Sequence, residues 1–375
     1  MKNTFRRSVA LILALIFAFS LTAFAFADES VFDDGAYASI LTASDFQDDE
    51  TYAYQRFGRI LNKMKDDGLE TPHSMLAGGD FSLDMPDYPA PYITLIRRIL
   101  SDAYPCMNTN SLTCIQGNHD NAVSGFAKTG FNDMGEYCLY CINEDDFRWQ
   151  QYKYPEAEAK IKALADDIKK CLDSMIEKND LRPVIVMTHV PLHLSFRYDG
   201  GDNWYSSYVF DVLNEAGKTL DITFLFGHNH SAPYDDYIGG SVNFFAPGNK
   251  ILIPTVGGAG SGYTEETLNF VYTNYGYVGY SYNFATESST DVLTVGVIRL
   301  CDDSVKYVKY TEDGLYSMQS VDRKNPVAHS DSASSAGVPR LNAWLFSKLE
   351  NRFYSNLLNI YRVLTYILHL PTPLT

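Results

Sequence analysis

Residues 112–120 read LTCIQGNHD. The first five residues form a short apolar run that is typical of a buried strand, and the chain then reaches a glycine and presents Asn118, His119 and Asp120. The carboxyl end of a strand in an open α/β sheet is where sites are built. Asparagine offers a neutral oxygen ligand, histidine a proton donor or metal ligand, and aspartate a partner that can fix a histidine tautomer. The stretch therefore predicts a buried strand that delivers a polar site.

Similar junctions between an apolar strand and polar residues recur along the chain. We expect strands at 38–43, 74–77, 184–188 and 222–226. They end in Ser44-Asp45-Phe46-Gln47, in Gly78-Gly79-Asp80, in His189 and in Gly227-His228-Asn229-His230. Helical spacing of apolar residues predicts helices at 49–67, 91–103, 156–177 and 204–217. This alternation of strands and helices favours a parallel sheet with crossover helices.

Two regions depart from this alternation. Residues 121–154 are rich in glycine, asparagine and aromatic residues, and we interpret them as an insertion over the carboxyl edge of the sheet. After His230, strand-like runs at 242–246, 251–256, 292–300 and 305–310 alternate with glycine-rich turns. That pattern predicts a second sheet, mainly antiparallel, packed on the first.

The amino terminus indicates export. Three basic residues precede the apolar run 9–24, and Ala25-Phe26-Ala27 is a typical cleavage site, so we expect a signal peptide at 1–27 and a secreted or extracytoplasmic protein. The chain has 375 residues and a formal charge of −16, and losing the three basic residues makes the exported form more acidic. Such a protein should not bind nucleic acid through bulk charge. Six cysteines permit disulfides without specifying their pairing.

The polar residues at the strand ends form one set of oxygen and imidazole donors. Its members are Asp45, Gln47, Asp80, Asn118, His119, His189, His228 and His230. Such groups crowd together at a sheet edge only when something binds them, and divalent metal is the usual answer. The number of ligands indicates two ions, and a donor set without thiolate suits Mn, Fe or Zn. Two such ions about 3.5–4 Å apart hold a bridging hydroxide that attacks phosphoryl groups, while His119 is available as general acid.

In this order the motifs resemble those of the calcineurin-like metallophosphoesterases, over residues 38–310. The resemblance implies an α/β fold, a four-layer α/β/β/α sandwich, and hydrolysis of phosphate ester or diphosphate bonds in a phosphorylated small molecule or nucleotide-type substrate. By position, Asp45 and His230 would bind the first metal and Asp80 would bridge to the second. The second metal would be bound by Asn118, His189 and His228. His119 would be the general acid, oriented by Asp120.

One residue departs from the family pattern. The family usually has histidine two residues after the first aspartate, where this chain has Gln47. Glutamine is a weaker and harder ligand than imidazole, so the first site would favour Mn or Mg over Zn. A glutamine here resembles the branch of Mn-dependent ADP-ribose/CDP-alcohol diphosphatases. The alternative function is a catalytically weak or inactive, metal-stabilised binding module at the cell envelope.

The remaining segments complete the expected organisation. The phosphoesterase domain should span 33–318, followed by a polar linker at 319–340 and an amphipathic helix at 341–370 that could contact a membrane surface. On the loop after the His189 strand, Arg197 could meet a phosphate, and Tyr198 or Trp204 could stack on a base or sugar. We therefore predict a substrate wall formed by these three residues.

Overall fold

The computed structural model describes residues 31–47, 52–82, 90–120, 125–147, 154–193, 205–230, 243–256, 262–279 and 292–327. The helices and strands in these ranges belong to one compact unit that ends at Pro326. The expected signal peptide and C-terminal helix lie outside the described residues, as do Arg197, Tyr198 and Trp204. Within the described ranges, no helix combines the length and apolar character needed to cross a membrane.

The first sheet has six strands in the order β14-β13-β12-β1-β2-β3. Strands β1, β2 and β3 run parallel, whereas β12, β13 and β14 pair antiparallel. The bounds are β1 Ala38–Ala43, β2 Ser74–Ala77, β3 Leu112–Cys114, β12 Val295–Leu300, β13 Ser304–Thr311 and β14 Gly314–Asp322. Because β1 to β3 are parallel, their carboxyl ends meet at one edge of this sheet.

The second sheet also has six strands, in the order β4-β5-β6-β7-β11-β8. Its four central strands are parallel, and the edge strands β4 and β8 pair antiparallel. The bounds are β4 Gly130–Asp133, β5 Cys138–Cys141, β6 Val184–Met187, β7 Ile222–Phe226, β8 Phe244–Phe245 and β11 Val271–Asn274. A separate antiparallel pair joins β9 Lys250–Pro254 to β10 Tyr263–Thr267.

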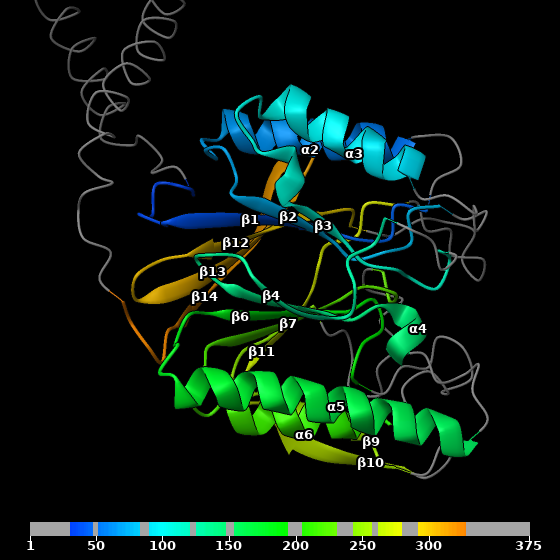
Figure 1. Cartoon of the computed structure of the whole chain (residues 1–375). Helices are drawn as coiled ribbons and strands as arrows, with labels where there is room; N and C mark the ends of the chain where they lie inside the picture. Colours follow the sequence, from blue (N-terminus) through cyan, green and yellow to red (C-terminus); the bar gives the residue numbers. More distant parts are fainter. Residues whose placement is uncertain are drawn as a thin grey trace, which may run out of the picture. The chain divides into compact units, whose positions relative to one another are not determined.

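Helices cover the outer faces of both sheets, which gives the expected four layers (Figure 1). Helices α2 and α3 lie over the first sheet, and α5 and α6 over the second. The helices are α2 Tyr52–Asp66, α3 Ala90–Ala103, α5 Tyr154–Glu177, α6 Ser206–Ala216, the short α4 Glu144–Phe147 and the 3-10 helix η1 Thr109–Ser111. Separate apolar clusters fill the spaces between α2, α3 and the first sheet, between the sheets, and between the second sheet and α5, α6.

Helix α2 illustrates why the sequence forms these layers. Tyr54, Phe57, Leu61 and Met64 recur every three or four residues and are all buried. This spacing places them on one face of the helix, toward the first sheet. Lysines in the last turn stabilise the negative end of the helix dipole.

The predicted division between the two sheets is wrong. The sequence pattern suggested one parallel sheet followed by a mainly antiparallel one. In the structure β6 and β7 lie in the second sheet, and β12 to β14 return to the first. Residues 121–154 are not only an insertion, because they contain β4 and the fully buried β5, which open the second sheet. An apolar run marks a buried strand without specifying the sheet to which it belongs.

The carboxyl end of the domain also needs correction. Strand β14 continues through Asp322, so the expected linker boundary at 319 falls inside a strand. Arg323 is buried and its guanidinium bonds Asp221 and the carbonyl of Cys301. The sequence pattern did not predict β14 as a strand, because most of its side chains are polar and exposed at the edge of the sheet.

The six cysteines all lie within the described residues, and none is in a disulfide. Burial raises the pKa of the Cys138 thiol to about 11 and that of Cys141 to about 12. Both residues belong to the buried strand β5. Cys138 and Cys141 are therefore two buried thiols inside a sheet.

Candidate metal centre

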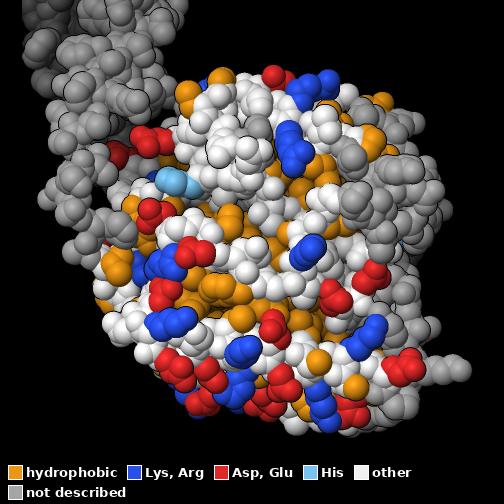
Figure 2. Space-filling view, in the orientation of Figure 1, with side chains coloured by type: hydrophobic (Ala, Val, Ile, Leu, Met, Phe, Trp, Pro, Cys, Tyr) orange, Lys and Arg blue, Asp and Glu red, His pale blue; other side chains and the backbone are white. Residues whose placement is uncertain are grey.

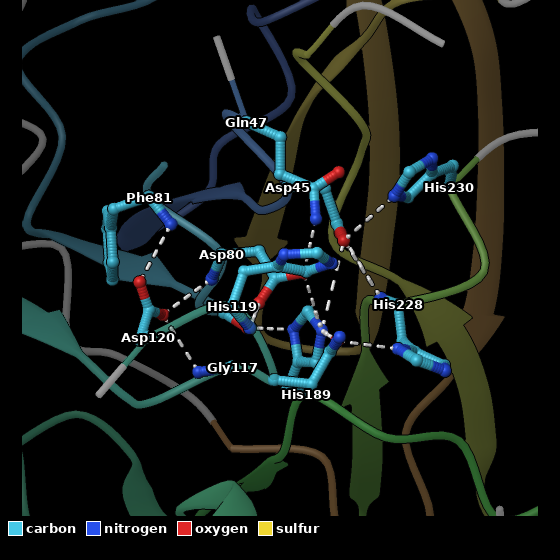
Figure 3. A network of polar contacts seen from close by, with 12 residues as sticks. Asp45, Gln47, Asp80, Phe81, Gly117, His119, Asp120, His189, His228 and His230 are labelled. Atoms are coloured by element: carbon cyan, nitrogen blue, oxygen red, sulfur yellow. Dashed lines mark hydrogen bonds and ion pairs between the residues drawn. The ribbon is translucent and has the colours of Figure 1, made fainter. Parts of the chain in front are cut away.

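The predicted ligands meet where the carboxyl edges of the two sheets come together. Asp45 follows β1, Asp80 follows β2 and Asn118 follows β3 in the first sheet, whereas His189 follows β6 and His228 follows β7 in the second. Figure 3 shows Asp45, Asp80, His189, His228 and His230 gathered in one cluster. The structure thus assembles in space the set of donors that the sequence places at five separate strand ends.

The centre of the set is a buried triad. Asp45, Asp80 and His189 each offer one ligand atom, and these atoms lie within 4.8 Å of one another. The Nε2 atom of His189 lies 3.2 Å from Asp80 Oδ2 and 3.9 Å from Asp45 Oδ1. All three residues are at most 1% exposed. Two carboxylates and an imidazole at this spacing, removed from water, form a donor set that fits a divalent ion.

The tautomer of His189 supports this fit. Its Nδ1 lies 2.8 Å from the carbonyl oxygen of Gly78, which can only accept a hydrogen bond, so Nδ1 carries the proton. The other nitrogen, Nε2, faces the two carboxylates and the amide oxygen of Asn118 at 2.9 Å. An Nδ1–H bound to a backbone carbonyl is the usual support of a metal-ligating histidine. His189 therefore presents an electron pair to a point surrounded by three oxygen atoms.

The charges of the triad lead to the same conclusion. Burial alone would raise the pKa of Asp45 and Asp80, but the adjacent imidazole of His189 holds both below the usual range. Burial alone would lower the pKa of His189, yet Asp80 and Asp45 raise it to about 10. Without a metal, a proton on His189 offsets the two negative charges. A divalent ion would replace that proton and compensate the carboxylates more completely.

The remaining predicted ligands surround the triad. The amide oxygen of Asn118 also lies 2.8 Å from His228 Nδ1, and the backbone N–H of His228 reaches both oxygens of Asp45 at 3.2 Å. His230 Nε2 lies 3.4 Å from Asp45 Oδ1. The His230 ring stacks on Tyr277, with 4.4 Å between ring centroids. Asn118 and Asp45 therefore connect histidines from the second sheet to the first.

The backbone at the site adopts an uncommon conformation. Five non-glycine residues in the described chain have positive φ, and four of them are predicted ligands: Asp45 at 55°, Asp80 at 56°, His228 at 66° and His230 at 57°. The left-handed region costs a non-glycine residue about 1–3 kcal/mol and is enriched at functional sites. The strain turns each side chain back over the end of its strand, toward the centre of the site.

The first glycine of the 117–120 motif and the first glycine of the 227–230 motif each make room for a carboxylate. A Cβ atom built on Gly117 would lie closer than 3.0 Å to Asp80 Oδ1, and one on Gly227 would lie 2.8 Å from Asp45 Oδ2. Real Cβ atoms essentially never approach a neighbour below 3.0 Å. Only glycine therefore lets these two loops close onto the carboxylates without displacing them.

Gln47 contacts the site in a different way from a metal ligand. Its side-chain nitrogen donates a 2.6 Å hydrogen bond to Asp80 Oδ2, and its backbone N–H bonds the Asp80 carbonyl at 3.1 Å. Gln47 is 5% exposed, so it is well placed beside the triad. In this geometry it orients the central carboxylate through its amide N–H.

Asp120 has a role other than the predicted one. Its carboxylate accepts hydrogen bonds from the backbone N–H groups of Gly117 at 2.9 Å, Asp80 at 2.7 Å and Phe81 at 3.1 Å. Both oxygens are thereby used on backbone, and no bond to the His119 side chain is formed. Burial, with the nearby charge of Asp80, raises the pKa of Asp120 to about 7. The expectation that Asp120 orients His119 is wrong: it ties the loop after β2 to the loop after β3.

His119 is held by its backbone. Its N–H donates a 2.8 Å bond to Asp80 Oδ1, which fixes the residue beside the central carboxylate. Its Nδ1 atom is buried and has no hydrogen-bond partner among the described residues. Figure 3 places the ring within the same cluster as Asp45 and His189.

A supporting network behind the site was not predicted. His193 is fully buried, with Nδ1 at 2.8 Å from the hydroxyl of Tyr272 and Nε2 at 3.0 Å from the side-chain nitrogen of Asn229. Asn229 is the residue between His228 and His230, so this network supports the loop that carries both. The burial of His193 and its two partners assign this residue to positioning that loop.

The four-layer fold and the ligands at the carboxyl edges of its sheets define a class of protein. It is a metal-binding α/β/β/α sandwich with its site where the two sheets meet. A family model described as calcineurin-like phosphoesterase matches residues 38–232, just over half of the chain. The chain therefore belongs to this family, and it is a metal-dependent hydrolase of phosphoric esters.

Comparison with solved structures gives distant similarities. A dimetal phosphatase from Danio rerio is 8% identical with a TM-score of 0.42, over 77% of this chain and 100% of that one. The Plasmodium protein GAP50, described as the anchor in the inner membrane complex, is 11% identical with a TM-score of 0.44, over 77% and 90%. A predicted phosphoesterase from Streptococcus pneumoniae is 12% identical with a TM-score of 0.32, over 76% and 98%. At these values the similarities carry no functional argument. No curated protein matches the sequence.

Proposed function

We propose that the chain is an exported phosphoesterase that uses two divalent ions and His119 as general acid. The observation that carries the proposal is the geometry of His189. Its Nδ1 carries the proton, so the electron pair of its Nε2 faces the oxygen atoms of Asp80, Asp45 and Asn118. Asp45, Asp80, Asn118, His189, His228 and His230 would hold the ions, and Gln47, which the sequence predicted as a ligand, would orient Asp80 through its amide N–H. Such ions supply Lewis acidity, which activates water and offsets the charge of phosphoryl oxygens.

The residues of the chain have distinct roles in this proposal. Asp80, between the loops of β1 and β3, would be a ligand of the ions, and Gln47 and the His119 N–H orient its carboxylate. His119 donates a proton to the leaving oxygen. Because Nδ1 of His119 is buried, we assign the transferable proton to Nε2. The donor set contains no thiolate, and position 47 carries no imidazole, so Mn is the favoured ion over Fe, Zn and Mg.

The general-acid role is tested by varying the leaving group. Phosphodiesters that release p-nitrophenol need little protonation, whereas esters of ordinary alcohols need a proton. We expect His119→Ala to lose roughly 100- to 10,000-fold in kcat on the alcohol ester and much less on the p-nitrophenyl ester. Asp80→Asn should lose turnover on both. Equal rates for wild type and His119→Ala on the alcohol ester would refute the assignment.

The substrate is proposed to be a phosphorylated small molecule or a nucleotide-type compound. The acidic composition disfavours bulk binding to nucleic acid. Figure 2 supports this, because on the face shown Lys and Arg side chains alternate with Asp and Glu instead of forming a basic surface. Export is tested by sequencing the amino terminus of the mature protein, which should begin after Ala27. Contact of 341–370 with membranes is tested by flotation with anionic vesicles.

A second function, a binding module with little or no turnover, is favoured by one contact. The amide of Gln47 occupies an oxygen of Asp80 that would otherwise be free for an ion. If this bond weakened the first metal site, the fold could bind metal without efficient catalysis. Protein with two ions per chain that hydrolyses no mono-, di- or diphosphate ester would favour this function over the first.

A further inference from the structure

A cavity of about 270 Å³ lies beside the metal centre, between the two sheets. Its walls include His230 and Tyr277 on the side of the metal centre, and Asn274, Lys309 and Ser317 on the far side. We call it the Lys309 cavity. Its size is near the lower end of small-molecule pockets, which hold roughly 300–1,000 Å³. The cavity therefore has room for one small polar group next to a predicted ligand of the first ion.

The strand register places Lys309 at the same edge as the metal centre. Thr42 pairs with Gly296 across β1 and β12, and Gly296 pairs with Lys309 across β12 and β13. Asp45 follows Thr42 by three residues, just beyond the end of β1. Lys309 is therefore two strands away from the strand that delivers Asp45, at nearly the same height along the sheet. His230, Tyr277 and Lys309 all line the same cavity.

Lys309 is partly buried and has no matching negative charge beside it among the described residues. Its ammonium group donates a hydrogen bond to the carbonyl oxygen of Asn274 on β11. Among the described residues no carboxylate lies within ion-pair distance of it, and burial lowers its pKa to about 7. Arg299, a buried cation of the same sheet, is by contrast paired with Asp34. A buried cation is costly unless an anion compensates it.

The surroundings of the ammonium group suit an oxyanion. Gly296 leaves space over β12, since a Cβ atom there would lie 3.2 Å from Lys309 Nζ. Ser317 and Gln319 line the same cavity from β14, and both residue types carry hydrogen-bond donors. A cation with neighbouring neutral donors is the usual composition of a phosphate or carboxylate site.

We infer that the Lys309 cavity is a subsite for a second anionic group of the substrate, such as the second phosphoryl group of a diphosphate. This inference rests on the proposed function, because the first phosphoryl group is taken to lie at the metal centre. It narrows the substrate class to molecules with two neighbouring negative charges. A diester with a single charge would leave the cavity without its ligand.

The test compares two probes that cannot be hydrolysed. Methylphosphonate carries one phosphoryl-like group, and methylenediphosphonate carries two. Calorimetric titration of the Mn-loaded full chain with each probe gives two dissociation constants, and their ratio reports the second site independently of turnover. The variants are Lys309→Met, which keeps the length of the side chain, and Lys309→Gln, which keeps a donor for Asn274. Lys170→Met on the exposed outer face of α5 is the matched control.

We expect the wild type and Lys170→Met to bind the diphosphonate at least about tenfold more tightly than the monophosphonate, since a charge-assisted hydrogen bond supplies that much. In both Lys309 variants the ratio should fall to near one, while the affinity for the monophosphonate is unchanged. A ratio that survives both substitutions overturns the inference. An equal loss of affinity for both probes in the Lys309 variants also overturns the inference. Lys309 would then hold the first phosphoryl group or free phosphate.

Turnover is measured on the same preparations. If the chain hydrolyses no ester but keeps a ratio that depends on Lys309, the proposed function fails and the subsite stands. If it hydrolyses esters and the ratio does not depend on Lys309, the subsite fails alone.

Discussion

Gly227 offers a sharp test of the metal centre, because a single methyl group there would press on a ligand. In Gly227→Ala the added Cβ would lie 2.8 Å from Asp45 Oδ2 and still closer to Ser44 Oγ. Reaching the 3.0 Å limit of real contacts moves the Asp45 oxygen by at least about 0.2 Å, which is the whole tolerance of a metal–ligand bond. We expect a loss of stability of about 1–3 kcal/mol from overpacking, and metal affinity lower by roughly 10- to 100-fold.

The assay is thermal unfolding with and without saturating Mn, together with hydrolysis of a simple phosphodiester. Ligand binding raises the melting temperature in proportion to the logarithm of affinity, so Gly227→Ala should lose part of the Mn-induced shift. Gly58→Ala is the matched control: Gly58 lies within α2, and its new Cβ would meet only Ile99 at 3.4 Å. This control should gain about 0.5–1 kcal/mol of stability and keep its metal response.

Two outcomes separate steric from general effects. In the double variant Ser44→Ala with Gly227→Ala, the contact with Ser44 Oγ is relieved and the contact with Asp45 remains. Stability should recover in part while metal affinity stays low. If Gly227→Ala alone binds Mn and turns over as the wild type does, the carboxylate of Asp45 does not bind the ion and the assignment is refuted.

Three further expectations follow from other parts of the structure. Lys309 has a pKa of about 7 in the folded chain, against an ordinary value of 10.5 for an exposed lysine. Its charge therefore lowers the stability of the folded chain below pH 7, and this penalty disappears as the pH rises to 10.5. The difference in unfolding free energy between Lys309→Met and wild type should shrink over this pH range, and a constant difference would contradict the burial of the charge. His193→Leu removes the hydrogen bonds to Tyr272 and Asn229, so the Mn-induced shift in melting temperature should become smaller. His193→Gln should restore part of that shift. Unchanged metal affinity in both variants would refute the positioning role of His193. Asp34→Asn leaves Arg299 buried without its ion pair, so urea unfolding should show a loss of about 3–5 kcal/mol in the free energy of unfolding. Turnover of the folded fraction should stay at the wild-type value. A smaller loss of stability would mean that another group compensates the charge of Arg299.

Local elements were predictable because their signals are local. The strands at 38–43, 74–77 and 222–226 have the predicted bounds, since each is a short apolar run closed by polar residues. The helices were also predicted to within a few residues, from the spacing of apolar side chains. The candidate ligands were found for the same reason: each stands directly after such a strand.

The pairing of strands was not predictable in the same way. Strand β1 has an antiparallel neighbour, β12, on one side and a parallel neighbour, β2, on the other, and nothing in its own sequence distinguishes the two. Strand β14 was hidden because an exposed edge strand carries polar residues. Both features depend on contacts between distant segments.

The detailed roles at the site also depend on three-dimensional contacts. The sequence placed Asp120 beside His119, but its carboxylate binds backbone from two neighbouring loops. Lys309 looked like an ordinary lysine within a strand, and only the register across β12 places it beside the metal centre. The positive φ values of Asp45 and Asp80 could not be read from residue type alone, because aspartate adopts that conformation only where tertiary contacts impose it.

Metal-dependent phosphoesterase activity is tested most directly by hydrolysis with metal-stripped mature protein, to which Mn, Mg or Zn is added back. The substrates are a simple diester, a simple monoester and ADP-ribose, and Asp80→Asn is assayed in parallel. We expect turnover that depends on the added metal, is highest with Mn, and is lost in Asp80→Asn. No turnover with any metal or substrate, while two ions are bound per chain, would contradict it.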